Sequence, residues 1–223
     1  WLVLDPDALP RGKVTFVELG CGHGLVGLAC AAVRPESMLV LTDVQALLPY
    51  AERSLAVNSE ELSSRVAVRP LPFGDGAALK AIFEEFGADS SSTKSHFMML
   101  GAGIAYWDCL HEPLAETLGD ACALGGEAII AYFRRDWKVE RRLWTKLLPQ
   151  RGLLVEVLWE GTVEEPDDVA SFAPACTRTP GEWNARVYRI ARAEVEAKPE
   201  QNEETWDQPW KAFGTNKKGA RKK

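Results

Sequence analysis

Three closely spaced glycines near the amino terminus, with an acid on either side, are the residues best suited to bind a ligand. Glu18 precedes Gly20, Gly22 and Gly24, and Asp43 follows them. Glycines tolerate positive φ and let a ligand approach the backbone closely, and the first amides of a following helix are free to donate. The carboxylate of Asp43 can accept hydrogen bonds from both hydroxyls of a ribose, each worth about 1.5–3 kcal/mol. These residues therefore predict a site for a nucleoside-containing ligand.

The residues around this turn predict the elements that carry it. Residues 14–19 are mostly β-branched and aromatic, with one acid near the end, and predict a buried strand. Residues 25–33 are small and apolar and read as a buried helix that stops before Pro35. Residues 38–42 read as a second strand, which ends at Asp43. The alternative is a plain tight turn with Asp43 as a helix cap, and it leaves this order of strand, turn, helix, strand and acid unexplained.

Further along the chain, short apolar strands alternate with helical segments. We expect strands at 66–69, 96–100, 127–133, 153–159 and 185–191, and helices at 47–58, 77–86, 112–123 and 137–148. Such alternation predicts a parallel sheet with helices on both faces. The last two strands have no helix between them and should form an antiparallel hairpin. The prediction is an α/β, Rossmann-like, doubly wound sheet of seven strands, mostly parallel, in a domain of residues 1–192.

The glycine turn resembles a known motif. Residues 18–24 read E-x-G-x-G-x-G, which is similar to motif I of class I (seven-β-strand) S-adenosylmethionine-dependent methyltransferases. The continuation Gly24-Leu-Val-Gly-Leu-Ala resembles the methyltransferase-like branch that contains many protein-lysine methyltransferases. Residues 70–74 and 100–106 stand where that branch has its L-D-W-G and L-G-A-D-I/V-x-Y segments. The resemblance covers about residues 13–192.

The resemblance implies S-adenosyl-L-methionine as the cofactor and methylation of a protein lysine as the activity. The cofactor-binding residues that it implies are Glu18, Gly20, Cys21, Gly22, Gly24, Asp43, Phe73 and Ala102. Of these, Glu18 would hold the methionine part through its amine or a water, Asp43 the ribose, and Phe73 would pack beside the adenine.

Methyl transfer from a sulfonium is an in-line displacement that depends mainly on proximity and alignment. A lysine nucleophile must lose a proton, so we expect an acid or an aromatic wall that orients the amine. Tyr106 and Trp107 are the predicted catalytic wall, and packing in the core at a strand end is the alternative. His96 and His111 lack metal-ligand partners at suitable spacing, so we expect no metal site and place both at the surface or at helix caps.

The sequence also departs from that branch. Gly103 stands where the branch has the aspartate of D-x-x-Y, and Pro72 where it has the aspartate of L-D-W-G. Asp75 is a substitute contact for the adenine by proximity alone. A second hypothesis is therefore a catalytically weakened methyltransferase fold, serving as a subunit or assembly factor of a larger, ribonucleoprotein-type complex. A nicotinamide dehydrogenase is a third, which the glycine spacing fits poorly.

The composition sets the outer bounds. The chain has 223 residues, 46% of them hydrophobic, and no apolar run near the roughly 20 residues of a membrane-spanning helix. The net charge of -6 argues against a nucleic-acid binder as a whole. Five cysteines without CxxC spacing predict buried apolar residues in a reducing compartment. We therefore expect a cytoplasmic protein, with nucleus and organelle left open.

The carboxyl-terminal extension, residues 193–223, differs from the domain before it. Residues 206–223 contain Trp206 and Trp210 and end in a basic run from Lys217. Such a run can contact RNA phosphates or an acidic partner, or act as a nuclear address. The alternative is a solvated end. The chain begins with Trp1 and shows no signal peptide, so we expect it to be part of a longer protein.

Overall fold

A computed structural model describes residues 12–87, 96–134, 137–164 and 182–193. Its seven-stranded sheet has the order β3-β2-β1-β4-β5-β7-β6. The strands are β1 (Val14–Glu18), β2 (Met38–Asp43), β3 (Val66–Pro70), β4 (His96–Ala102), β5 (Glu127–Phe133), β6 (Leu153–Glu164) and β7 (Glu182–Arg192). The first five pair in parallel, and β7 pairs antiparallel with both β5 and β6. The predicted doubly wound sheet with its terminal hairpin is confirmed.

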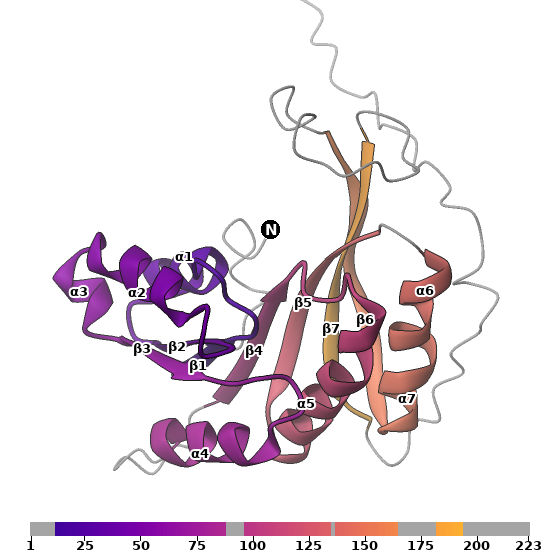
Figure 1. The fold of residues 1–223 in the computed structure, drawn as a ribbon, viewed down its shortest axis with the longest axis horizontal. Coiled ribbons are helices and arrows are strands. Elements are labelled where there is room, and N and C mark those ends of the chain that lie inside the picture. Colours follow the sequence, from indigo (N-terminus) through magenta and orange to yellow (C-terminus); the bar gives the residue numbers. More distant parts are fainter. Residues whose placement is uncertain (1–11, 88–95, 135–136, 165–181, 194–223) are drawn as a thin grey trace, which may run out of the picture.

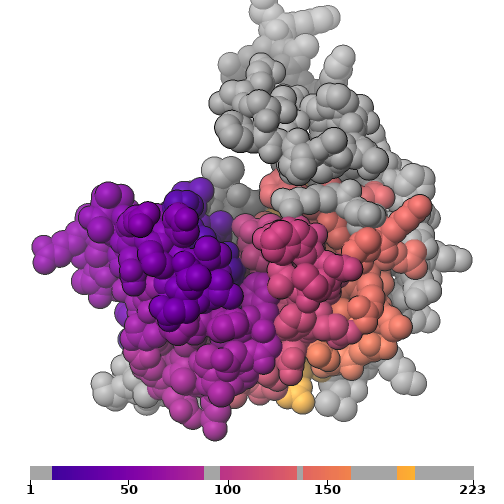
Figure 2. Space-filling model, in the orientation of Figure 1, coloured from indigo at the N-terminus to yellow at the C-terminus, as the bar shows by residue number. Residues whose placement is uncertain are grey.

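Helices cover both faces of this sheet, as Figure 1 shows. One face carries α1 (Leu25–Val33), α2 (Leu48–Ala56) and α3 (Glu60–Ser63). The other carries α4 (Gly76–Gly87), α5 (His111–Ala123), α6 (Trp137–Arg142) and α7 (Leu148–Gln150). On the face seen in Figure 2, residues 12–87 (indigo to magenta) pack directly against the later described residues (pink to orange).

Alternate residues of the central strands supply two hydrophobic cores, one on each face of the sheet. Phe16 and Leu39 belong to the core beside α1, whereas their neighbours Val17 and Val40 belong to the core beside α4 and α5. All four side chains are fully buried. Because successive side chains of a strand point to opposite faces, near-continuous apolar strands are what a sheet covered on both sides requires.

The predicted helix over 137–148 is interrupted. After α6 the chain forms a π-helix, Leu143–Leu147, before α7. A regular helix over 137–148 would place Val139 on the same side as the buried Leu143 and Leu147, but the extra residue in that turn rotates the preceding residues, and Val139 is exposed. Glu140 is buried instead, and its carboxylate accepts a hydrogen bond from the hydroxyl of Tyr132 on β5. Period-3.6 reasoning was wrong here because a π-bulge changes the phase of the helix.

Other boundaries differ less. The helix expected over 47–58 ends at Ala56, and the short helix α3, capped by the Ser59 hydroxyl, was not predicted. The hairpin strands β6 and β7 extend further at the loop end than the sequence indicated. The extension beyond Ala193 lies outside the described residues. Within the described ranges, no helix is long and apolar enough to cross a membrane.

This topology decides where a ligand site can form. The carboxyl ends of β3, β2, β1 and β4 lie side by side at one edge of the sheet. The chain leaves β1 toward α1 on one face and leaves β4 toward α5 on the other. Ligands of open α/β sheets bind outside the carboxyl ends of the strands at such a switch point.

Candidate functional site

The glycine turn joins the end of β1 to the start of α1. Gly20, Gly22 and Gly24 have φ of +57°, +53° and +76°, in the left-handed region where glycine is favoured. A Cβ at Gly24 would lie 2.8 Å from Cδ1 of Leu41, whereas one at Gly22 would meet no atom within 4 Å. Gly24 is therefore required by packing against β2, and Gly22 leaves open space at the turn.

Asp43 is held rigidly at the end of β2. Its Oδ2 accepts from the amide of Gly22 at 2.9 Å, and its Oδ1 accepts from the amide of Val44 at 2.8 Å. The residue is 8% exposed. An ionised carboxylate has about four lone-pair sites, so these two bonds orient the group and leave each oxygen able to accept one more. The carboxylate also ties the glycine turn to β2.

Glu18 stabilises the glycine turn through a hydrogen bond with the start of α1. It is buried, and its Oε2 accepts from the amide of Gly27 in the first turn of α1 at 2.8 Å. Burial raises the pKa of Glu18 to about 7, with the charge of Asp43 adding to the rise, while the amides of Gly27 and Val26 oppose it. Glu18 thus satisfies amides that the start of a helix otherwise leaves unpaired.

A pocket of about 470 Å³ opens above this edge of the sheet. Its lining residues are Gly20, Gly22, Asp43, Val44, Leu47, Leu71, Pro72, Phe73, Ala102, Gly103, Ile104, Tyr106, Trp107, Leu110 and Pro113. A volume of this size suits a small organic ligand or cofactor. The segments that form it come from the ends of β1, β2, β3 and β4, which is where the topology predicts a site.

The pocket brings together most of the residues that the sequence singled out. Seven of them line it, namely Gly20, Gly22, Asp43, Phe73, Ala102, Tyr106 and Trp107. Glu18, Cys21 and Gly24 are outside the lining. Cys21 is buried, its amide donates to the carbonyl of Thr42 at 2.9 Å, and burial raises its thiol pKa to about 12. Glu18, Cys21 and Gly24 therefore contact α1 and β2 and not the pocket.

Ile104 is a lining residue that the sequence analysis missed. A Cβ at Gly20 would lie 3.0 Å from Cγ2 of Ile104 and 3.4 Å from Cζ of Phe73. Ile104 follows β4 and Phe73 follows β3, so these two side chains approach the glycine turn from either side and form an apolar floor. A single apolar residue such as Ile104 gives little indication in the sequence of whether it packs in the core or lines a pocket.

Tyr106 and Trp107 stand at the open side of the pocket. They are 40% and 59% exposed, and their ring centroids lie 4.6 Å apart at 59°. The alternative of core packing is therefore wrong for both. Gly103 precedes them with φ of +64°, its amide donates to the carbonyl of Ala131 at 3.1 Å, and a Cβ there would meet nothing within 4 Å.

Other sequence expectations need correction. His111 does lie at a helix end, as the C-cap of the 3₁₀ helix Asp108–Leu110, but it is buried and not at the surface, and its Nε2 lies 3.1 Å from the carbonyl oxygen of Ala105. Cys109 is exposed, unlike Cys21, Cys30 and Cys122, and Cys176 lies outside the described residues. Both differences arise at the loop and 3₁₀ helix between β4 and α5, which carry no periodicity that would predict burial.

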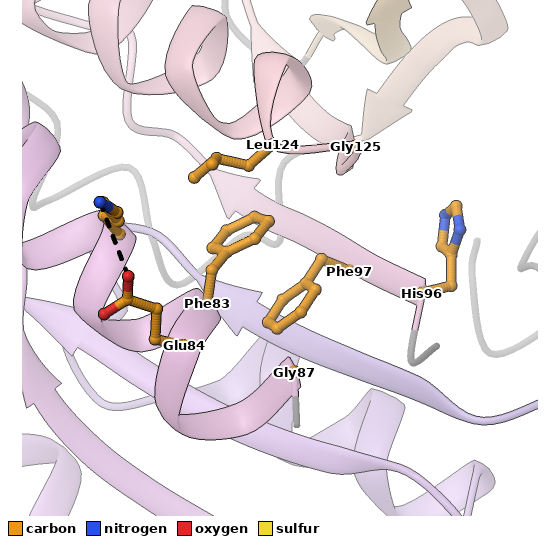
Figure 3. A pocket seen from close by; sticks show the side chains of 8 residues that line it. Phe83, Glu84, Gly87, His96, Phe97, Leu124 and Gly125 are labelled. Carbon is orange, nitrogen blue, oxygen red and sulfur yellow. Dashed lines mark ion pairs between the residues drawn. The ribbon is translucent and has the colours of Figure 1, made fainter. Parts of the chain in front are cut away.

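A second hollow, of about 480 Å³, lies at the opposite edge of the sheet. Figure 3 shows it between the end of α4 and the start of β4, where Phe83 stacks on Phe97 at 4.0 Å between ring centroids. Lys80 and Glu84 form an exposed ion pair at 3.6 Å beside it. This hollow is at the amino end of β4, so the rule for open α/β sheets favours the first pocket as the functional site.

Comparisons with known proteins point in one direction. A family model described as lysine methyltransferase (Methyltransf_16) matches residues 7–148, which is more than half of the chain. S-adenosylmethionine is the cofactor of that family. Among the curated proteins, no sequence matches significantly.

Solved structures share the fold at low identity. Precorrin-6y C5,15-methyltransferase from Geobacter metallireducens GS-15 is 11% identical, with a TM-score of 0.53 over 86% of this chain and 87% of that one. The glycopeptide N-methyltransferase MtfA in complex with S-adenosyl-L-methionine is 8% identical, with a TM-score of 0.53 over 84% of this chain and 90% of that one. These likenesses confirm the methyltransferase-type fold.

Proposed function

Since the chain belongs to the lysine methyltransferase family, we propose that it transfers a methyl group from S-adenosylmethionine to a lysine side chain of a protein substrate. The observation that carries this proposal is the pocket at the carboxyl edge of the sheet. It combines a glycine turn, a fixed carboxylate and an exposed aromatic pair.

The residues on one side of the pocket suit the cofactor. Asp43 keeps one acceptor site on each carboxylate oxygen for the two ribose hydroxyls, because its two backbone bonds use only part of its capacity. Gly20 and Gly22 let a ligand approach the turn closely. Phe73 offers an apolar surface to a purine ring. When bound, S-adenosylmethionine supplies a methyl group on a positively charged sulfur, which a nucleophile displaces in line.

The residues on the other side suit an amine. Tyr106 and Trp107 present aromatic faces that attract a cation within about 6 Å, and they hold the lysine side chain in a fixed direction, which is what a displacement needs. Of the described residues that line the pocket, Asp43 alone carries a carboxylate. The amine therefore gives its proton to water before it attacks.

The weakened fold stays as the second candidate, because one specific observation favours it. Gly103 leaves the acceptor side without a carboxylate. A protein with an intact cofactor side and a poor acceptor side would bind S-adenosylmethionine and transfer its methyl group slowly.

Labelled methyl transfer separates these candidates. The protein, tritiated S-adenosylmethionine and a heat-treated cell lysate are incubated together, and the protein fraction is hydrolysed to amino acids. We expect label in methyl-lysine with the wild type and none with Asp43→Ala. Cofactor binding by calorimetry without any transfer would instead support the weakened fold.

We further propose, from the sequence alone, that residues 206–223 contact a partner complex or RNA and that the protein acts in the cytoplasm. Those residues lie outside the described ranges. Deleting 206–223 from the full chain and measuring binding to total RNA in low and high salt tests the first point, because phosphate contacts are lost as salt rises.

A further inference from the structure

The segment that follows β3 forms one wall of the pocket, and most of its backbone N–H groups are already engaged. The amide of Leu71 donates to the carbonyl of Asp43 at 2.9 Å. The amide of Gly74 donates to the hydroxyl of Thr117 on α5 at 2.8 Å. The amide of Asp75 donates to the carbonyl of Pro72 at 3.1 Å.

Few backbone N–H donors therefore remain to hydrogen-bond with the edge of a ring. Pro72 lines the pocket and has no N–H. Among the described residues, the amide of Phe73 has no hydrogen-bond partner, and it is the one free N–H between Leu71 and Asp75. The wall therefore offers a flat apolar surface and a single backbone donor.

No carboxylate takes part in this wall. Asp75 is exposed, and its Oδ1 accepts from the amide of Ala78 at 2.9 Å, which caps the start of α4. Asp75 is also absent from the lining of the pocket. The carboxylate of Asp43 is directed by the amides of Gly22 and Val44 at the end of the neighbouring strand.

We propose that this pocket binds the purine of its cofactor without recognising the group at position 6, so that a 6-oxo purine is accepted nearly as well as adenine. The inference rests on the proposed function, which places the ribose at Asp43 and the base beside Phe73. The chemical class of ligand is an S-nucleosyl homocysteine whose purine carries either an amino or an oxo group at position 6.

The chemistry of the two bases explains the expectation. Adenine presents an acceptor at N1 and donor hydrogens on its 6-amino group, whereas hypoxanthine presents a donor at N1 and an acceptor at O6. The amide of Phe73 can pair with N1 of adenine or with O6 of hypoxanthine. If a site holds an acceptor for the 6-amino group, that acceptor is left unpaired when hypoxanthine binds. Such unpaired buried groups are what make a site selective.

Calorimetric titration with two defined ligands tests this. The probes are S-adenosylhomocysteine and S-inosylhomocysteine, and the proteins are the wild type, Pro72→Asp and Pro72→Ala. Position 72 is exposed, so both substitutions are tolerated by packing. Pro72→Ala is the matched control, because it removes the proline ring without adding a carboxylate.

The wild type and Pro72→Ala should bind the two ligands with affinities less than tenfold apart. Pro72→Asp should widen that ratio at least tenfold in favour of the adenosyl ligand. A tenfold or greater adenosyl preference in the wild type overturns the inference and leaves the proposed function standing. An unchanged ratio in Pro72→Asp also overturns it, because the base would then lie elsewhere. Binding of neither ligand overturns the proposed function itself.

Discussion

The two sides of the pocket are built differently. The cofactor side is fixed by backbone hydrogen bonds: Asp43 accepts two amides, and Glu18 accepts the amide of Gly27 beneath the same turn. The acceptor side consists of Gly103, which carries no side chain, and of Tyr106 and Trp107, which are 40% and 59% exposed. The cofactor side is therefore preorganised before any ligand binds. The acceptor side relies on contacts that form only when a substrate binds.

The construction of the two sides predicts which changes will affect binding and which will affect rate. Preorganised donors and acceptors bind a ligand without paying to order themselves, so the cofactor side should lose affinity steeply when it is altered. Exposed aromatic side chains supply contact area and orientation, so the acceptor side should lose rate more than cofactor affinity. Each of the following changes is aimed at one side.

Asp43→Ala should cause the largest loss. Removing a carboxylate that accepts two ribose hydroxyls should weaken S-adenosylhomocysteine binding about 100-fold or more, at 1.5–3 kcal/mol for each bond to a charged group. Calorimetry measures it directly. Asp75→Ala is the control, because its carboxylate caps α4 instead, and its affinity should match the wild type. Equal affinities for wild type and Asp43→Ala would disprove the ribose assignment.

Glu18, on the cofactor side, should make the free energy of unfolding depend on pH. Its pKa is about 7 in the folded protein against 4.5 for the free side chain. The folded state therefore holds more protons than the unfolded state between these values, and the free energy of unfolding falls as pH rises through them. The loss amounts to about 3 kcal/mol.

Denaturant unfolding between pH 4 and pH 8 checks this against Glu18→Gln, whose amide oxygen can still accept from Gly27. The difference in unfolding free energy between the two proteins should change by about 3 kcal/mol across that window. Parallel pH curves for the two would show that Glu18 ionises normally.

Tyr106→Ala should act on the acceptor side alone. We expect methyl transfer to fall at least tenfold, because the lysine side chain loses one wall that orients it, while S-adenosylhomocysteine affinity stays within threefold. Tyr50→Ala is a matched control, since Tyr50 is 43% exposed and stacks edge-on with His23 away from the pocket lining. Transfer at the wild-type rate in Tyr106→Ala would show that the wall lies elsewhere.

Gly103→Asp should give the smallest effect and the opposite sign. A carboxylate at this position would attract the lysine ammonium, and a Cβ there meets nothing within 4 Å. The φ of +64° is one that Asp and Asn tolerate better than most residues. We expect kcat/KM to rise a few-fold at pH 7.5. Gly103→Asn carries the same backbone strain without the charge, and equal rates in both variants would exclude an electrostatic origin.

Sequence periodicity predicted the sheet well, because apolar strands and the helices between them repeat with clear spacing. It failed at the π-helix Leu143–Leu147, where one extra residue exposes Val139 and buries Glu140. The expected surface position of His111 was also wrong, since the residue is buried with its Nε2 3.1 Å from the carbonyl oxygen of Ala105. Both errors concern side-chain direction, which local pattern alone does not determine.

The candidate site divides in the same way. The residue types that meet at the edge of the sheet were predictable from sequence, because a glycine turn after one strand and an acid after the next are local features. Folding was needed to show that Asp43, Phe73 and Tyr106 share one pocket, whereas Glu18, although inside the same motif, pairs with the amide of Gly27 in α1. The reason is physical: strand order brings distant chain segments together, and burial then decides which polar groups face a ligand and which must pair with backbone.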